Sequence, residues 1–90
     1  MEMIFSSQAL EDLDYWKKNG NKAIMNKIST LLADIMEHPF TGIGKPEALK
    51  YDLSGYFSRR INSEHRIVYC VHDDMIEVLI LSLRFHYSKK

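Results

Sequence analysis

Apolar residues recur at helical spacing in two segments of the first half of the chain. The second series is the stronger, because its members form a single stripe at i, i+4, i+7, i+8 and i+11: Ile24, Ile28, Leu31, Leu32 and Ile35. The first series is Leu10, Leu13 and Trp16. Asn19-Gly20-Asn21 separates the two segments, and His38-Pro39 ends the second. We therefore predict two helices that pack their apolar stripes against a common core.

The rest of the pattern is typical of strands. Two runs rich in β-formers, at 53–61 and 65–71, flank the polar break at 62–64 and predict an antiparallel hairpin. The nearly continuous apolar run at 75–83 predicts an interior strand, and shorter segments at 1–5 and 49–53 predict two more. The resulting order, βααββββ, predicts an α+β domain in which two N-terminal helices pack on one face of a mostly antiparallel sheet.

Length and composition fit one small domain that spans residues 1–90. The chain is 46% hydrophobic and 27% charged, as is ordinary for a globular protein. Its single cysteine, Cys70, excludes a disulfide framework within the chain and favours a reducing compartment. No apolar run is long enough to span a membrane, and the N-terminus lacks the pattern of a signal peptide. We expect a cytoplasmic protein.

The charges cancel in number but not in distribution. Twelve basic and twelve acidic side chains argue against a protein that coats nucleic acid through bulk charge. Residues 45–66 nevertheless hold five basic and three acidic side chains, and residues 84–90 hold three basic ones and no acid. If these segments lie side by side, they form a local positive patch that suits a site for a few phosphates.

Arg66 and Glu47 each allow two interpretations. On the predicted strand, Arg66 shares a face with Val68 and Cys70. It either packs its alkyl stem at a sheet edge and reaches water, or it binds a phosphate or a carboxylate. Glu47 follows a glycine- and proline-rich loop at 39–46 and is either a surface partner of a nearby lysine or a site carboxylate. Spacing alone does not bring the two residues together.

Four histidines and one cysteine raise the question of a metal. His65 and His72 should point to opposite faces of a strand, because their separation is odd. Cys70 and His72 share a face, but two ligands do not make a site, so we expect no metal and no cofactor. His86 lies two residues beyond Arg84 on an extended segment, and the pair is either equipped for acid–base work on phosphate or simply part of a polar terminus.

Four motifs, in order along the chain, resemble the YoeB/Txe family. They are PFTGIGKPEALK (39–50), LSGYFSRRI (53–61), EHRIVY (64–69) and RFHY (84–87). This family contains toxins of the RelE-like superfamily from bacterial toxin–antitoxin modules. The resemblance covers essentially the whole chain and implies a microbial-RNase-like fold and a bacterial endoribonuclease that cuts mRNA in the ribosomal A site. It also implies a YefM-like antitoxin that occupies the active site, and it leaves open whether the free protein forms a homodimer.

Matched position by position, the resemblance implies a role for six residues. Glu47 corresponds to the general base, His86 to the general acid, and Arg66 to the residue that stabilises charge on the scissile phosphate. Three further positions line the same site: Lys50, Arg60 and Tyr87. In this scheme the carboxylate deprotonates a ribose 2′-hydroxyl, the arginine binds the crowded phosphorane and the imidazolium protonates the departing 5′-oxygen, so no metal is required.

A second class of function stays open. A non-catalytic module of the same fold would bind its antitoxin, or RNA, without cutting. The presence of all three residues of the cleavage set favours the enzyme, because a decayed member would more often have lost one. The chain also departs from the family by continuing past the last tyrosine with Ser88-Lys89-Lys90, which brings two more positive charges close to His86.

Overall fold

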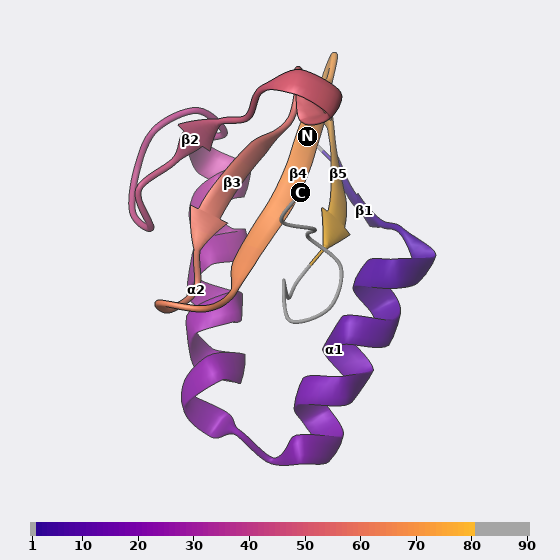
Figure 1. Ribbon diagram of the computed structural model, residues 1–90, viewed down its shortest axis with the longest axis vertical. Helices are drawn as coiled ribbons and strands as arrows, with labels where there is room; N and C mark the ends of the chain where they lie inside the picture. The colour runs from indigo at the N-terminus through magenta and orange to yellow at the C-terminus, as the bar shows by residue number, and fades with distance from the viewer. Residues whose placement is uncertain (1, 81–90) are drawn as a thin grey trace.

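The computed structural model describes residues 2–80, which form a layer of strands and a layer of helices (Figure 1). The strands are β1 (Glu2–Phe5), β2 (Glu47–Ala48), β3 (Phe57–Arg60), β4 (Arg66–His72) and β5 (Met75–Ile80). The helices are α1 (Ser7–Asn19) and α2 (Lys22–Glu37), and a short 3-10 helix, η1 (Tyr51–Leu53), follows β2. The order βααββββ and the α+β class are confirmed. Within residues 2–80, neither helix has the length and apolar character needed to cross a bilayer.

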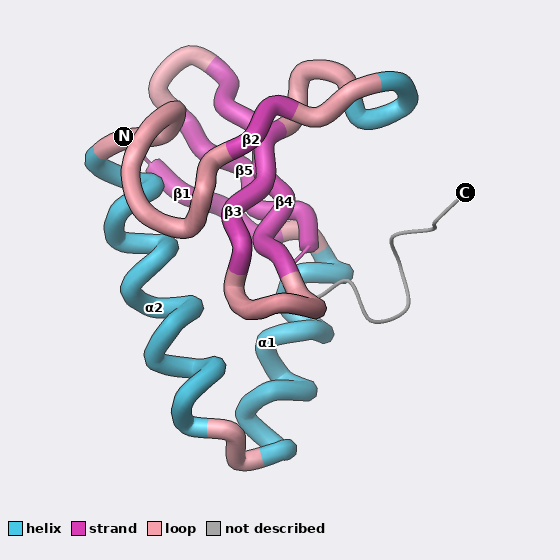
Figure 2. The backbone as a smooth tube through the Cα atoms, turned by 60° about the vertical axis from the view of Figure 1, so that its left-hand side comes forward, coloured by secondary structure: helices cyan, strands magenta, loops and turns pink. Residues whose placement is uncertain are grey.

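Both helices begin and end where local chemistry requires it. The Ser6 side chain accepts a hydrogen bond from Ala9 N and caps α1. Gly20 ends α1 in the left-handed region, at φ 72°, which costs a glycine little. The Asn21 side chain caps α2 by accepting from Ile24 N at 3.1 Å. The two predicted helices are thus confirmed, together with the break between them, and Figure 2 shows them side by side on one side of the sheet.

The sheet has the strand order β1-β5-β4-β3-β2. The β3–β4 pair is the predicted hairpin, with Phe57 opposite Tyr69 and Arg60 opposite Arg66. All neighbouring strands are antiparallel except β1 and β5, which run parallel. This arrangement confirms the mostly antiparallel sheet and puts the apolar strand β5 in its interior.

The core lies between the sheet and the two helices. Along β4 the side chains of Ile67 and Tyr69 face the helices, whereas Arg66 belongs to the opposite face. The buried core residues come from both layers: Ala9, Trp16, Ile28, Leu31, Ile35, Ile61, Ile67, Tyr69, Ile76 and Val78. The stripe predicted along α2 therefore supplies three of its members, Ile28, Leu31 and Ile35, to the core.

The strand predicted at 49–53 is wrong in its position. The chain pairs with β3 one step earlier, at Glu47–Ala48, and then leaves the sheet. Lys50, Tyr51 and Asp52 are all exposed, so Tyr51, which strand alternation would put on the apolar face of this segment, is not buried against the core. Tyr51 also has a positive φ of 57°, which no extended strand adopts. The predicted strand at 75–83 is described as far as Ile80, and its last residues lie outside the described part of the chain.

Candidate active site

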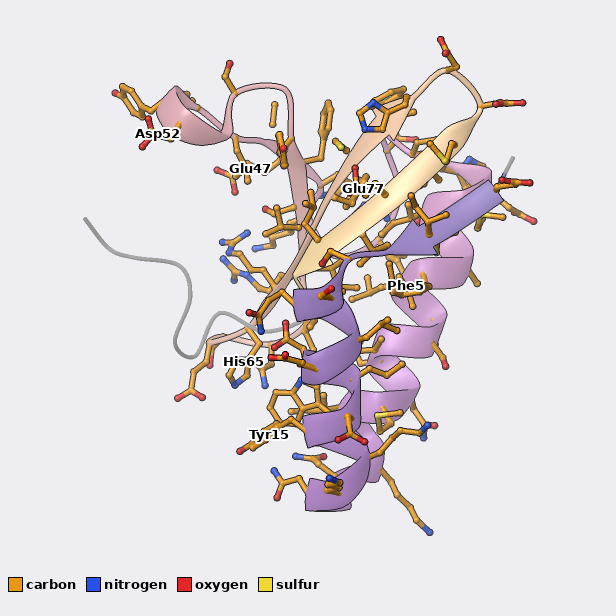
Figure 3. The ribbon with its side chains drawn as sticks, turned by 90° about the vertical axis from the view of Figure 1, so that its right-hand side faces the viewer. Phe5, Tyr15, Glu47, Asp52, His65 and Glu77 are labelled. Carbon is orange, nitrogen blue, oxygen red and sulfur yellow. The ribbon has the colours of Figure 1, made fainter. Side chains whose placement is uncertain are left out.

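The sheet brings Glu47 and Arg66 together on the face that points away from the helices. Glu47 is opposite Ser58 across β2 and β3, and Arg60 is opposite Arg66 across β3 and β4. Directly opposed residues of an antiparallel pair project to the same side, so these four residues share one face. The Arg66 Nη1 atom donates to Ser58 Oγ at 3.1 Å and lies 3.4 Å from Glu47 Oε1. Three adjacent strands thus each contribute to one polar cluster, and Figure 3 shows Glu47 on β2.

The contact between Arg66 and Glu47 is loose and open to solvent. The side chain of Glu47 is 61% exposed and that of Arg66 is 25% exposed. An ion pair of this length and exposure contributes little to stability, so an incoming anion can replace it. Within residues 2–80, the side-chain hydrogen bonds of Arg66 all come from Nη1, which leaves Nε and Nη2 able to bind a phosphate in a two-pronged contact.

Of the other four predicted site residues, the structure describes Arg60 and Lys50. Arg60 is exposed at the end of β3 and lines a pocket of about 380 Å³, which Lys27 and Lys45 also line, so three cations surround that space. Lys50 is exposed, three residues after Glu47. His86 and Tyr87 lie outside the described residues, so the general acid remains a prediction from the resemblance. The structure therefore brings together the predicted base and phosphate-binding arginine.

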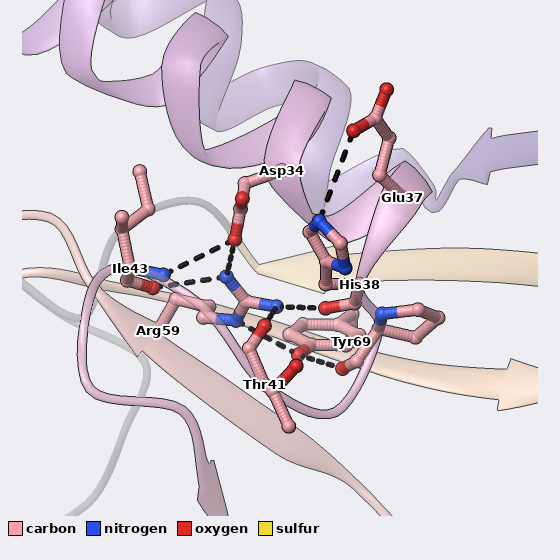
Figure 4. Close-up of polar contacts among 8 residues, drawn as sticks. Asp34, Glu37, His38, Thr41, Ile43, Arg59 and Tyr69 are labelled. Carbon is pink, nitrogen blue, oxygen red and sulfur yellow. Dashed lines mark hydrogen bonds and ion pairs between the residues drawn. The ribbon is translucent and has the colours of Figure 1, made fainter.

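The sequence interpretation missed the role of Arg59, the neighbour of Arg60 on the opposite face of β3. Its side chain is fully buried and uses all five of its N–H donors. The acceptors are one carboxylate, one phenol and three backbone carbonyls (Figure 4): Asp34 Oδ2 at 2.7 Å, Tyr69 Oη at 3.1 Å, Ile43 O at 2.9 Å, Thr41 O at 2.7 Å and His38 O. A signal was present in the sequence, because strand alternation gives Arg59 the core face of β3.

The Arg59 cluster holds the loop that leads to Glu47. Tyr69, which accepts from Arg59, donates its own hydroxyl to Pro39 O at 2.6 Å. Burial raises the pKa of the Tyr69 phenol, so that it stays neutral and keeps this donor. Gly42 has a φ of 118°, and a Cβ at this position would lie 2.0 Å from Asp34 Oδ2. The loop therefore packs so closely around the Arg59 guanidinium that residue 42 has no room for a side chain. This packing fixes the position at which β2 begins.

The ionisation of Asp34 makes the stability of the Arg59 cluster depend on pH. Its hydrogen bond from Arg59 lowers the pKa of the carboxyl below 3.8, with a further contribution from Ile43 N, against a smaller opposing effect of desolvation. Because the pKa is lower in the folded state, the stabilisation is complete above about 3.8, the unfolded value, and is lost as pH falls through the folded value.

We expect Asp34→Asn to be less stable than the parent at neutral pH and to lose stability less steeply on acidification. The difference in free energy of unfolding between the parent and Asp34→Asn should become smaller as pH falls below 3.8, because the parent carboxyl then takes up its proton. Urea unfolding at a series of pH values measures this difference. Asp14→Asn, on the exposed face of α1, is the matched control and should follow the parent curve. A gap that stays constant through the acid range would contradict the assignment.

The candidate catalytic residues do not resemble a metal centre. Among the described residues, one group has metal-ligand spacing, and it contains neither Glu47 nor Arg66. That group is Cys70, His72 and Glu77, and it lies further along β4 on the same face, about 13 Å from Arg66 by strand rise. The donor set of the candidate active site is instead a carboxylate and a guanidinium, which together offer a base and an anion-binding group.

Comparison with known proteins identifies the same family as the four sequence motifs. A family model described as "YoeB-like toxin of bacterial type II toxin-antitoxin system" matches residues 5–87. "Toxin YoeB" of Escherichia coli K12 is 47% identical over 87 residues, which cover 97% of this chain and all of that protein. "Toxin RelK" of Mycobacterium tuberculosis is 47% identical over 83 residues, covering 92% of this chain and 94% of that one.

Solved structures agree with the sequence matches. The "YoeB/ParE toxin from Agrobacterium tumefaciens" superimposes with a TM-score of 0.88 at 37% identity, covering 97% of this chain and all of that one. YoeB in the Staphylococcus aureus YoeB–YefM heterotetrameric complex gives 0.84 at 45% identity, covering 97% of this chain and 98% of that one. YafQ from E. coli, at 18% identity and a TM-score of 0.76 over 90% of each chain, shares the fold. This chain belongs to the YoeB-like toxins of bacterial type II toxin–antitoxin systems.

Proposed function

We propose that this toxin is an endoribonuclease that inhibits translation by cutting mRNA, without a catalytic metal. The observation that carries the proposal is the 3.4 Å approach of Glu47 Oε1 to Arg66 Nη1 on an exposed sheet face. A carboxylate and an arginine that lie in contact on a solvent-exposed surface supply a base and an anion-binding group for attack by a ribose hydroxyl. The pocket lined by Lys27, Lys45 and Arg60 supports the proposal, because it offers further cations for a polynucleotide backbone.

The proposed reaction uses three residues in sequence. Glu47 takes the proton of a 2′-hydroxyl, and the 2′-oxygen attacks the adjacent phosphorus. Arg66 leaves its loose contact with Glu47 and binds the equatorial oxygens of the phosphorane, where negative charge accumulates. His86, carried over from the family resemblance, protonates the 5′-oxygen as its bond to phosphorus breaks. The products are a 2′,3′-cyclic phosphate and a free 5′-hydroxyl. From the same family resemblance, we propose that Lys50 and Tyr87 line the site.

The proposed partners follow from the family and from its solved members. YoeB of S. aureus has been solved with YefM and also as a dimer. We propose that a YefM-like antitoxin binds this chain and covers the face that carries Glu47 and Arg66, and that the free toxin self-associates as a homodimer. The proposed site of action is mRNA in the ribosomal A site, in the bacterial cytoplasm.

The decisive experiment replaces one ribose at the cut. An RNA with a single 2′-deoxy nucleotide on the 5′ side of the cleaved bond should resist cleavage there, because it lacks the nucleophile. Binding should be nearly unchanged, since the phosphates that dominate affinity remain. The unmodified RNA should give a 5′-hydroxyl on the downstream product, and excess EDTA should not inhibit when the magnesium required by ribosomes is controlled separately.

Two results would contradict this mechanism. One is cleavage of the deoxy-substituted RNA at the same bond, and the other is a downstream product that carries a 5′-phosphate. Binding of RNA or antitoxin with no cleavage by well-folded protein, on or off the ribosome, would instead support the alternative of a non-catalytic module.

A further inference from the structure

A second cluster of reactive side chains lies on the outer face of the sheet, away from the candidate active site. Cys70 on β4 is directly opposite Glu77 on β5, and His72 follows Cys70 by two residues on the same face. Figure 3 shows Glu77 on β5, on the sheet that also carries Glu47. The sequence interpretation counted only the cysteine and the histidine, because the third member comes from the neighbouring strand. Strand pairing thus converts two potential ligands into three.

The three ligand atoms are spaced as one small cation would require. His72 Nε2 lies 3.1 Å from Cys70 Sγ and 3.3 Å from Glu77 Oε1, and Cys70 Sγ lies 3.8 Å from Glu77 Oε1. Zinc bonds of about 2.3 Å to sulfur and about 2.0 Å to nitrogen or oxygen, at tetrahedral angles, separate ligand atoms by about 3.3–3.6 Å. The observed triangle therefore fits a shared tetrahedral ion after movements of a few tenths of an ångström.

The donor set also selects the kind of metal. A thiolate, an imidazole and a carboxylate together suit Zn²⁺, whereas Mg²⁺ and Ca²⁺ prefer oxygen ligands alone. Cys70 is 5% exposed, while the side chains of His72 and Glu77 are 52% and 32% exposed, so an ion reaches the cluster from the solvent side. Within residues 2–80 the group has three members, which leaves the fourth position of a tetrahedral ion for water or another ligand.

We propose that Cys70, His72 and Glu77 form a zinc-binding site that links strands β4 and β5. Because this ion binds the folded state, occupancy stabilises the sheet. The site is distinct from the proposed nuclease centre, since it shares no residue with it and begins about 13 Å further along β4. Its failure would leave the nuclease proposal standing, and cleavage by metal-stripped protein would leave the zinc proposal standing.

Cobalt is the probe that reports on the thiolate directly. Because Cys70 is the only cysteine, a thiolate-to-cobalt charge-transfer band on adding Co²⁺ to the tag-free full chain can come from no other side chain. We expect such a band to saturate at one equivalent and to disappear when Zn²⁺ displaces the cobalt. Saturating Zn²⁺, at about one hundred times its Kd, should raise the Tm by roughly 10 °C.

Variants of His72 and Glu77, the two ligands whose side chains reach solvent, test the site with little effect on folding. His72→Ala and Glu77→Gln should each weaken Co²⁺ binding by more than about 100-fold, and Cys70→Ser should abolish the charge-transfer band. His38→Ala is the matched control, since it removes another exposed histidine, at the end of α2, and should bind as the parent does. The absence of a thiolate band in the parent would overturn the proposal. So would Co²⁺ affinities of His72→Ala and Glu77→Gln that equal that of His38→Ala.

Discussion

Arg66→Ala should lower the rate of RNA cleavage by roughly a thousandfold or more, and it should abolish growth arrest when the toxin is expressed alone. The physical reason is that phosphorane formation concentrates negative charge on oxygens that this guanidinium is placed to bind. Arg66→Lys should recover only a small part of the rate, because an ammonium group cannot reproduce the two-pronged contact. Single-turnover cleavage of a defined mRNA on programmed ribosomes measures both effects.

The melting temperatures of the same variants show whether a loss of cleavage comes from lost catalysis or from unfolding. Arg66 holds Ser58 and Glu47 in a partly exposed cluster, so its loss should change the melting temperature little. Glu47→Gln should likewise remain folded and lose most of its activity, since an amide cannot accept the 2′-hydroxyl proton. Lys18→Ala removes a cation from the exposed face of α1 and should cleave as the parent does. An Arg66→Ala protein that melts normally and cuts within tenfold of the parent rate would refute the assigned role.

Arg59→Met should reduce the free energy of unfolding by about 3–5 kcal/mol, a large share of the stability of a chain of 90 residues. Methionine fills much of the same volume but donates no hydrogen bonds. The substitution leaves the Asp34 carboxylate without its charge partner and strips three loop carbonyls and the Tyr69 hydroxyl of a donor. Urea unfolding gives the free energy, and hydrogen exchange of the amides at 41–44 reports whether the loop has opened.

The adjacent arginine provides the control. Arg60→Met removes the same group from the solvent-facing side of β3 and should change stability by less than about 0.5 kcal/mol. Leu31→Ala should cost about 2–5 kcal/mol by opening a cavity under α2, but it leaves the Arg59 hydrogen bonds in place, so the exchange of the loop amides should rise less. Equal destabilisation by Arg59→Met and Arg60→Met would show that burial of the Arg59 charge is not what holds the loop.

The predictable features were those that depend on neighbours in the chain. Spacing along α2 identified Ile28, Leu31 and Ile35 as core residues, and the polar break at 62–64 identified the hairpin. The register of β2 was missed, because it depends on where an edge segment meets Ser58 and not on its own composition. Pattern alone also did not pair Glu47 with Arg66, since three strands must align to do so; only the family resemblance linked them.

The Arg59 cluster shows the same limit more clearly. Alternation put Arg59 on the core face of β3, but its carboxylate partner, Asp34, is 25 residues earlier on a helix. Asp34 occupies a polar position between the buried residues Leu31 and Ile35, where a polar side chain is usually a surface residue. Only packing of α2 against β3 brings the two charges into contact. Glu77 was missed as a neighbour of Cys70 for a similar reason, because the pairing of β4 with β5 decides it.

The parallel pairing of β1 with β5 has a consequence for how the protein matures on the ribosome. Ser6, which caps α1, also donates its hydroxyl to Leu79 O, 73 residues away, and residues 2–5 pair with residues 75–78. The first strand of the nascent chain therefore has no partner in the sheet until residues 75–78 have been synthesised. Contacts of such long range form late and slow the folding of a domain. We expect the toxin to acquire its complete sheet only after β5 has left the ribosome, which gives a co-produced antitoxin time to meet it.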